Sequence, residues 1–109
     1  MKLRLAPEAV EDITGIKQYI REELGNPSAS NQIAGKIVKS NKQLKASPYI
    51  GALLRSKVSF ETTMRFLVTG NYLIFYDVNE KESFVEITSI LHGKRNFIKI
   101  LFQADEVSD

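Results

Sequence analysis

The sequence has no cysteine and only one histidine among its 109 residues. Without cysteine there is no disulfide framework, no thiolate nucleophile and no zinc site built on thiolates. His92 cannot assemble a metal site by itself, so we expect neither a metal nor a cofactor. No apolar run approaches the roughly 20 residues that cross a bilayer, and the N-terminus turns polar after position 5. These absences favour a cytoplasmic protein with no signal peptide and no membrane partner.

An excess of charge of one sign is absent as well. The formal net charge is +2 and the sequence pI is near 8.9, which is too mildly basic to indicate nucleic-acid binding. The hydrophobic content of 43% suffices for one core, so we expect a single domain over residues 1–109. The acidic residues 103–109 are expected to fray.

The rest of the chain is organised around residues 64–100. Apolar runs at 64–68 and 72–78 are separated by a Thr-Gly-Asn turn signal, and a third run covers 83–91. β-Branched and aromatic residues bounded by such turns predict an antiparallel meander. Tyr72 and Tyr76 alternate with apolar neighbours at period two, which indicates semi-buried aromatics rather than nucleophiles.

The N-terminal half predicts a strand at residues 2–6 and two helices, one from about 7 to 24 and one from 27 to about 46. Gly25 is expected to end the first helix, and Asn26 and Pro27 are expected to begin the second. Helical spacing marks a buried stripe of Val10, Ile13, Ile16 or Lys17, Ile20, Leu24, Ile33, Ile37, Ser40 or Asn41, and Leu44. Four lysines, Lys36, Lys39, Lys42 and Lys45, indicate a solvated face.

The signals between residues 48 and 63 are mixed and predict a loop that leads into a short edge strand at 58–60. The resulting order is an α+β fold: an N-terminal strand, a helical hairpin packed on a small, mainly antiparallel sheet, and a short C-terminal helix.

This order, the Pro48-x-x-Gly51-x-Leu53 spacing, the strand that begins Gly70-Asn71-Tyr72, and the ending Ile-Leu-His-Gly-Lys-Arg-Asn at 90–96 resemble the ParE/RelE superfamily of bacterial toxins from type II toxin–antitoxin systems. The resemblance covers roughly residues 2–101. It implies one of two activities. RelE-like members cut messenger RNA on the ribosome with a set of cationic and proton-transferring side chains, whereas ParE-like members inhibit DNA gyrase and lack that set.

The ribonuclease pattern fits this sequence poorly. Lysines are expected where the chain has Met64 and Phe66, an arginine where it has Leu73, and a tyrosine where it has Leu101. The ending at 90–96, in contrast, looks ParE-like. The resemblance therefore implies a ParE-like toxin that binds DNA gyrase and is neutralised by a cognate antitoxin. A RelE-like endoribonuclease acting on ribosome-bound mRNA through His92, Arg95 and Arg65 is the alternative, and a member that has lost toxicity is a third possibility.

Candidate site residues follow from this interpretation. An amphipathic C-terminal segment predicts target contacts by Lys94, Arg95, Phe97, Ile98 and Leu101. An apolar groove for the antitoxin is predicted at Tyr49, Leu53, Leu54, Val58 and Phe60. Arg65, Lys94 and Arg95 are expected to form one basic patch or to be ordinary surface charge. His92 can exchange protons near neutral pH, but ordering the turn at Gly93 is its more ordinary role.

Overall fold

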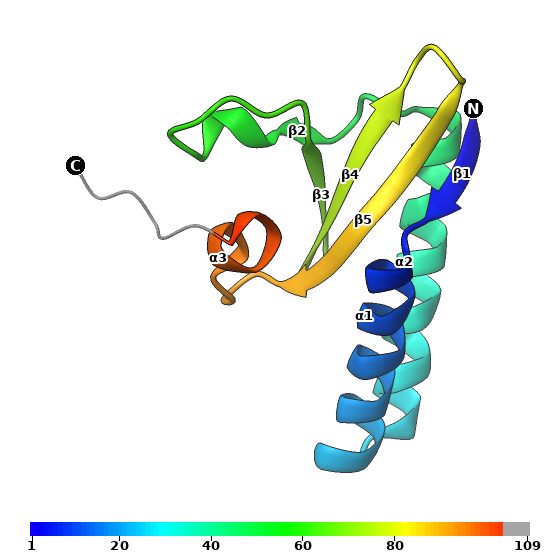
Figure 1. Ribbon diagram of the computed structural model, residues 1–109. Coiled ribbons are helices and arrows are strands. Elements are labelled where there is room, and N and C mark those ends of the chain that lie inside the picture. Colours follow the sequence, from blue (N-terminus) through cyan, green and yellow to red (C-terminus); the bar gives the residue numbers. More distant parts are fainter. Residues whose placement is uncertain (104–109) are drawn as a thin grey trace.

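A five-stranded sheet organises residues 1–103, which are the part of the chain that the computed structural model describes (Figure 1). The strand order is β1-β5-β4-β3-β2, with β1 parallel to β5 and the other neighbours antiparallel. The strands are β1 (Lys2–Leu5), β2 (Ala52–Leu53), β3 (Arg65–Thr69), β4 (Tyr72–Asn79) and β5 (Phe84–His92). The predicted N-terminal strand, meander and α+β class are confirmed. Residues 104–109 of the tail expected to fray lie outside the described residues, while Gln103 caps the last helix.

A helical hairpin covers one face of this sheet. Helix α1 (Pro7–Gln18) continues into a π-helical turn, η1 (Tyr19–Glu23), and α2 (Pro27–Ala46) returns beside it (Figure 1). Gly25, at φ +61°, makes the turn between them, and the Asn26 side chain accepts a hydrogen bond from Ala29 N–H at 3.0 Å. The predicted stop and start signals are therefore confirmed.

The hairpin buries most, but not all, of the predicted stripe. Ile37 and Leu44 are almost fully buried, and Ile13, Ile16 and Ile33 pack against the same core. Val10, however, is 48% exposed, because Ala9 takes the inward position and the next residue lies about 100° further round the helix. Leu24 is 59% exposed because the wider π-helical turn shifts the phase before it.

A bulge in β5 fixes α1 to the sheet. Phe75 of β4 pairs with Ser89 whereas Tyr76 pairs with Ile87, so β5 has one extra residue at this point. The Asp12 carboxylate of α1 accepts hydrogen bonds there from Ser89 Oγ at 2.6 Å and from Ile90 N–H at 2.9 Å. The helix is thereby held at one position along the strand.

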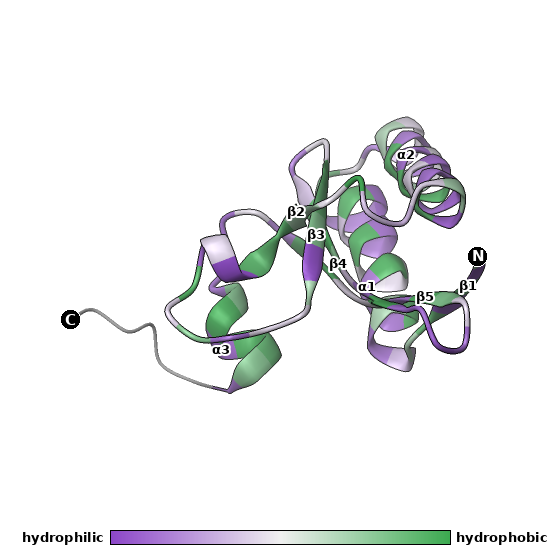
Figure 2. Cartoon of the chain, turned by 90° about the horizontal axis from the view of Figure 1, so that it is seen from above, coloured by the Kyte–Doolittle hydropathy of each residue, from purple (hydrophilic) through white to green (hydrophobic). Residues whose placement is uncertain are grey.

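The opposite face of the sheet is covered only in part, by the short helix α3 (Phe97–Phe102) and by a 3₁₀ turn, η2 (Leu54–Ser56) (Figure 2). A second, smaller apolar cluster forms here around Leu54, Met64, Phe75 and Leu91. None of the helices in residues 1–103 is both long and apolar enough to span a bilayer.

The predicted edge strand at 58–60 is wrong, because the edge strand is β2 at Ala52–Leu53. Tyr76 sets this position: its hydroxyl donates to Pro48 O at 2.8 Å and accepts from Gly51 N–H at 2.9 Å. Only glycine fits at position 51, since a Cβ would lie 2.4 Å from the Tyr76 oxygen. Strand pairing therefore starts at the next residue, and Val58 packs on the second cluster instead.

Candidate functional site

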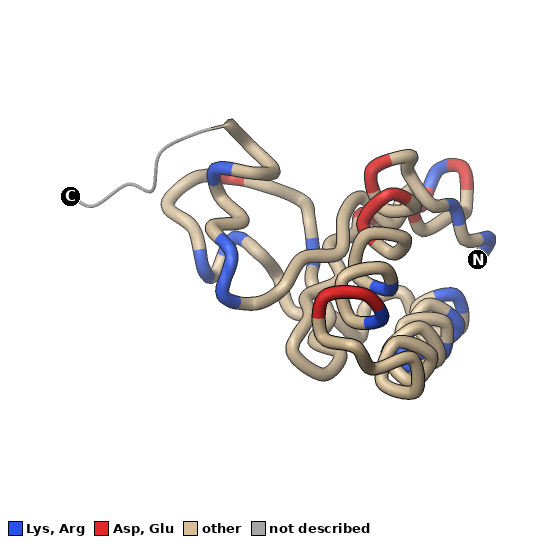
Figure 3. The backbone as a smooth tube through the Cα atoms, turned by 90° about the horizontal axis from the view of Figure 1, so that it is seen from below, with Lys and Arg blue, Asp and Glu red and all other residues tan. Residues whose placement is uncertain are grey.

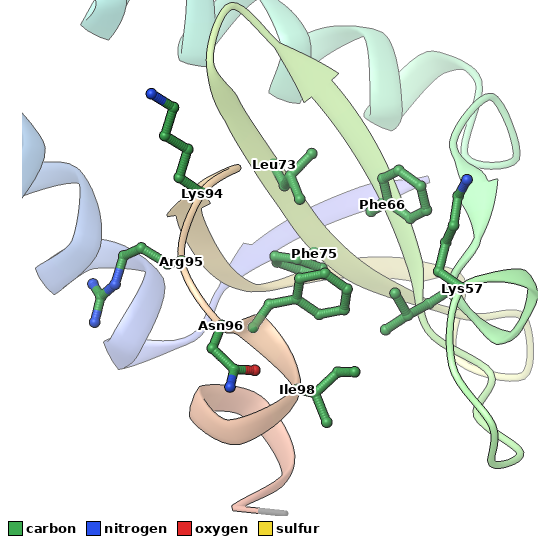
Figure 4. Close-up of a pocket in the computed structure, with 10 residues that line it drawn as sticks. Lys57, Phe66, Leu73, Phe75, Lys94, Arg95, Asn96 and Ile98 are labelled. Atoms are coloured by element: carbon green, nitrogen blue, oxygen red, sulfur yellow. The ribbon is translucent and has the colours of Figure 1, made fainter. Parts of the chain in front are cut away.

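A cleft of about 500 Å³ opens on the partly covered face, between the sheet, η2 and α3 (Figure 4). Phe66 comes from β3, Leu73 and Phe75 come from β4, and their side chains share this face because alternate residues of a strand point the same way. The lining residues are Leu54, Lys57, Phe66, Leu73, Phe75, Lys94, Arg95, Asn96, Phe97 and Ile98.

The floor of the cleft is apolar and largely aromatic. Phe75 is fully buried at its base, with ring centroids 6.4 Å from Phe66 and 5.4 Å from Phe97. Phe66, Leu73 and Phe97 are half-buried, so part of each side chain faces solvent. Val68, two residues after Phe66 on β3, is 60% exposed. The apolar surface therefore extends beyond the cleft along β3.

All charged side chains that the described residues place at the rim of the cleft are positive. Lys57 and Lys94 extend on opposite sides of the floor, whereas the Arg95 guanidinium turns away toward α1 (Figure 4). Among residues 1–103, no Asp or Glu lines the cleft. Within residues 1–103 the single ion pair joins Arg4 to Glu86 at 3.1 Å, so these three cations have no carboxylate partner there. Figure 3 shows several Lys and Arg positions at the end of the molecule that carries α3, and others along α2 and near the N-terminus.

The cleft brings together residues predicted for two different partners. Leu54, from the predicted antitoxin groove, lies with Lys94, Arg95, Phe97 and Ile98 from the predicted target surface. The other predicted target residue, Leu101, packs in the second apolar cluster. Phe60, from the predicted antitoxin groove, stacks edge-on against Phe102 at 4.8 Å between centroids. These two are thus used by the fold itself.

Tyr49 and Leu53, also predicted for the antitoxin, line a separate cleft that contains Arg65. Arg65 donates to Gly51 O at 2.9 Å, and its guanidinium lies 5.0 Å from the Tyr49 ring centroid. The Tyr49 hydroxyl donates to the Glu80 carboxylate, and this hydrogen bond raises the pKa of Tyr49. Arg65 therefore holds the loop before β2, and its contacts are structural.

The expected basic patch of Arg65, Lys94 and Arg95 is wrong. Arg65 pairs with Tyr76 of β4, whereas His92, just before Lys94, pairs with Tyr72. Four residues along a strand separate these pairs by about 13 Å. The same separation keeps Arg65 away from His92 and Arg95, the other two residues of the ribonuclease alternative.

His92 has the structural contacts of a turn residue. Its Nδ1 accepts a hydrogen bond from Lys94 N–H at 3.1 Å, and its ring packs edge-on against Tyr72, with centroids 5.3 Å apart. Burial raises the pKa of the neighbouring Tyr72 hydroxyl. His92 and Arg95 do line one cleft beside α1, with Glu11 and Tyr19.

Sequence reasoning missed Lys57, Phe66, Leu73, Phe75 and Asn96 as cleft residues. One signal was present: β4 is apolar at consecutive positions 73–76, which indicates a strand covered on both faces rather than on one. Lys57 gave no signal, because only the turn at η2 carries it to the cleft.

The family model described as ParE toxin of type II toxin–antitoxin system, parDE, matches residues 3–97. The chain belongs to this ParE toxin family. The same fold occurs in the chromosomal ParDE toxin–antitoxin system from P. aeruginosa, at a TM-score of 0.68 and 21% identity over 84% of this chain and 95% of that chain. It also occurs in the intact E. coli RelBE toxin–antitoxin complex, at a TM-score of 0.53 and 17% identity over 86% of this chain and 98% of that chain. A search among curated proteins gave no significant match. The chain is therefore a ParE-like toxin of a type II toxin–antitoxin system, as the resemblance implied.

Proposed function

We propose that this ParE-like toxin, acting as a single domain, binds and inhibits DNA gyrase, does not cut RNA, and is neutralised by a cognate antitoxin. Family membership supports the toxin role. The relatives of known structure are described as toxin–antitoxin systems or complexes, which supports an antitoxin partner for this chain.

One observation carries the choice of binding over cleavage. The four positions where the ribonuclease resemblance would require charged or polar groups are Met64, Phe66, Leu73 and Leu101, and all four belong to the second apolar cluster. Together with Phe75 they make this side of the sheet apolar, where a nuclease would need cations.

The number of missing charged groups argues against RNA cleavage at this site. Stabilising the charge on a phosphorus centre takes several preorganised donors, and losing one such donor typically slows an enzyme by roughly 100- to 1000-fold. Here Arg65 is already bonded to Gly51 O, and Arg95 points away from the floor (Figure 4). A binding surface has no such requirement.

The C-terminal segment presents charges for a target. Ile98 is buried, and Phe97 and Leu101 pack in the second cluster, so the apolar side of α3 is used by the chain itself. Lys94 and Lys99 remain exposed. We therefore assign the gyrase contacts mainly to exposed cations around α3 and to the open part of the cleft.

A supercoiling assay tests the proposal. Purified chain is added to DNA gyrase and relaxed plasmid, and we expect supercoiling to be inhibited. The double variant Lys94→Gln/Arg95→Gln should inhibit less, while the matched double variant Lys36→Gln/Lys39→Gln, on the outer face of α2, should inhibit like the parent. A folded chain that leaves gyrase fully active at stoichiometric excess would contradict the proposal.

A further inference from the structure

His92 ends β5 and begins the turn that leads to α3. The backbone N–H groups of residues 93–95 in this turn all have partners. Gly93 N–H donates to Asn71 O at 2.8 Å. Lys94 N–H donates to His92 Nδ1 at 3.1 Å, and Arg95 N–H donates to His92 O at 2.9 Å. The turn is therefore held mainly by His92, through its ring and through its backbone.

The hydrogen bond to the ring requires a neutral imidazole. A ring nitrogen accepts from an N–H group only when it carries no proton, so the single ring proton must lie on Nε2. An imidazolium has N–H donors on both nitrogens and offers no acceptor in any orientation. Histidine is the side chain that changes between these two forms between about pH 5 and 8. Acid therefore removes the partner of Lys94 N–H and sets two donors against each other.

The surroundings of the ring restrain its position. His92 is half-buried, and its ring packs edge-on against Tyr72, with centroids 5.3 Å apart. Because carboxylates and cations both lie near the ring, neither sign of charge dominates there. The titratable and charged groups that lie against it from α1, η1, β4 and the turn are Glu11, Asp12, Tyr19, Tyr72, Lys94 and Arg95.

The turn carries two residues that the proposed function assigns to the target. Lys94 and Arg95 are exposed, and their side chains extend in different directions, Lys94 beside the cleft floor and Arg95 toward α1 (Figure 4). A segment that is ordered before it binds loses less conformational freedom on binding. A turn without the hydrogen bond to Nδ1 must be ordered during binding, and this lowers the affinity.

We propose that His92 is a positioning residue for target binding: its neutral ring orders the turn at residues 93–95, and protonation of the ring frees that turn. Binding to the target therefore weakens as the pH falls through the titration of His92. This inference rests on the proposed function for the identity of the target, whereas the response of the turn belongs to the chain alone. If the turn stayed ordered in acid, the added positive charge beside Lys94 and Arg95 would act differently and would favour an anionic target.

NMR spectroscopy of the full chain, labelled with ¹⁵N, tests the response of the turn. His92 is the one histidine of the chain, so its ring signals are identified without further variants. We expect the proton on Nε2 at about pH 8, and we expect the Lys94 amide proton to move upfield along the titration curve of the ring as the pH falls to about 5.5. A neutral ring with its proton on Nδ1, or a Lys94 amide that does not follow the ring, would overturn the inference.

Two substitutions separate the acceptor from the rest of the side chain. In His92→Asn the side-chain oxygen takes the place of Nδ1 and can accept from the N–H group two residues on, as in an Asx turn, but it does not titrate. His92→Gln carries the same amide one methylene further out, which displaces the acceptor. Both variants lose the ring contact with Tyr72, so a difference between them reports the hydrogen bond. Circular dichroism confirms that each variant is folded.

Affinity for immobilised DNA gyrase tests the effect on binding. Between about pH 8 and about pH 5.5 the parent should lose about threefold to tenfold in affinity relative to His92→Asn, which is the range expected from one hydrogen bond. The comparison with His92→Asn at each pH removes any pH dependence of gyrase itself. His92→Gln should bind more weakly than His92→Asn at both pH values.

The outcomes separate this inference from the proposed function. A chain that binds gyrase with the same affinity relative to His92→Asn at both pH values, or more tightly in acid, keeps the proposed function and loses this inference. A chain whose Lys94 amide follows the ring as expected, but which neither binds nor inhibits gyrase, loses the proposed function and keeps the pH-dependent turn.

Discussion

The same strands form both faces of the sheet, but the two faces are covered to different extents. On the hairpin face, Ile74, Tyr76 and Ile87 are fully buried. On the opposite face, Phe66 and Leu73 stay half-buried and Val68 is 60% exposed. The apolar character of the strands is similar on both sides, so the difference lies in what covers them.

The covering elements differ in length. The 12-residue α1 and the 20-residue α2 cover one face, whereas the six-residue α3 and the turn η2 cover part of the other. The hairpin face therefore supplies most of the buried apolar contacts that stabilise the fold. The α3 face keeps apolar surface open, which is what the proposed binding role requires.

The largest loss of stability should come from truncating a side chain that is buried between the helical hairpin and the sheet. Ile37 is 1% exposed in the main core, and Ile37→Ala should lower the free energy of unfolding by about 2–5 kcal/mol. Urea denaturation followed by circular dichroism measures this. An unchanged unfolding midpoint would mean that the hairpin does not supply the main core.

A smaller effect is expected from the tyrosine that ties the loop before β2 to the sheet. Tyr76→Phe leaves Pro48 O and Gly51 N–H without their partner and should cost about 1–3 kcal/mol.

The contribution of Tyr76 should depend on pH. Burial raises the pKa of Tyr76 above 10.0, so its contribution to stability is complete below the pKa of an unfolded tyrosine and is lost as pH rises through the higher folded value. The difference in unfolding free energy between the parent and Tyr76→Phe should therefore narrow above pH 10, as pH titration of the two denaturation midpoints will show. A gap that widens with pH would contradict this assignment.

On the α3 face the same kind of truncation should matter less for stability. Leu73 is half-buried, so Leu73→Ala should cost only about 1 kcal/mol, compared with several for Ile37→Ala under the same conditions. A loss as large as that of Ile37→Ala would show that the two faces contribute equally to the fold.

The smallest stability effects belong to the cations of the rim. Lys57→Gln and Lys94→Gln should each stay within about 0.5 kcal/mol of the parent, since both are exposed and neither forms an ion pair within the described residues. Thermal melts of the two variants check this. A marked loss would assign these lysines to the fold instead of to a partner.

The sequence predicted the hairpin face better than the α3 face, and the reason is physical. Caps and breakers such as Gly25 and Asn26 act locally, so the helix ends were predictable. The burial of Ile37 and Leu44 followed from helical period alone. The predicted burial of Val10 and Leu24 was wrong, because the side of the helix that a residue faces depends on where α1 begins and on the π-helical turn.

The cleft depends on contacts between segments far apart in the chain. Leu54 and Lys57 meet Phe97 only because Tyr76 sets the position of the loop before β2 and α3 folds back over the sheet. No local sequence pattern predicts that these segments lie together. The same dependence explains why Arg65 was misplaced: its charge was visible in the sequence, but its hydrogen bond to Gly51 O was not.

The central claim is that the α3 face binds and does not cleave, and it can be tested in cells that express the chain from an inducible promoter. Primer extension maps the ends of messenger RNAs, and plasmid topology is read from the same cultures. We predict intact messages together with altered plasmid supercoiling. Ordered cuts within translated codons that vanish in His92→Ala or Arg95→Ala, with supercoiling unchanged, would contradict the account and establish the ribonuclease alternative.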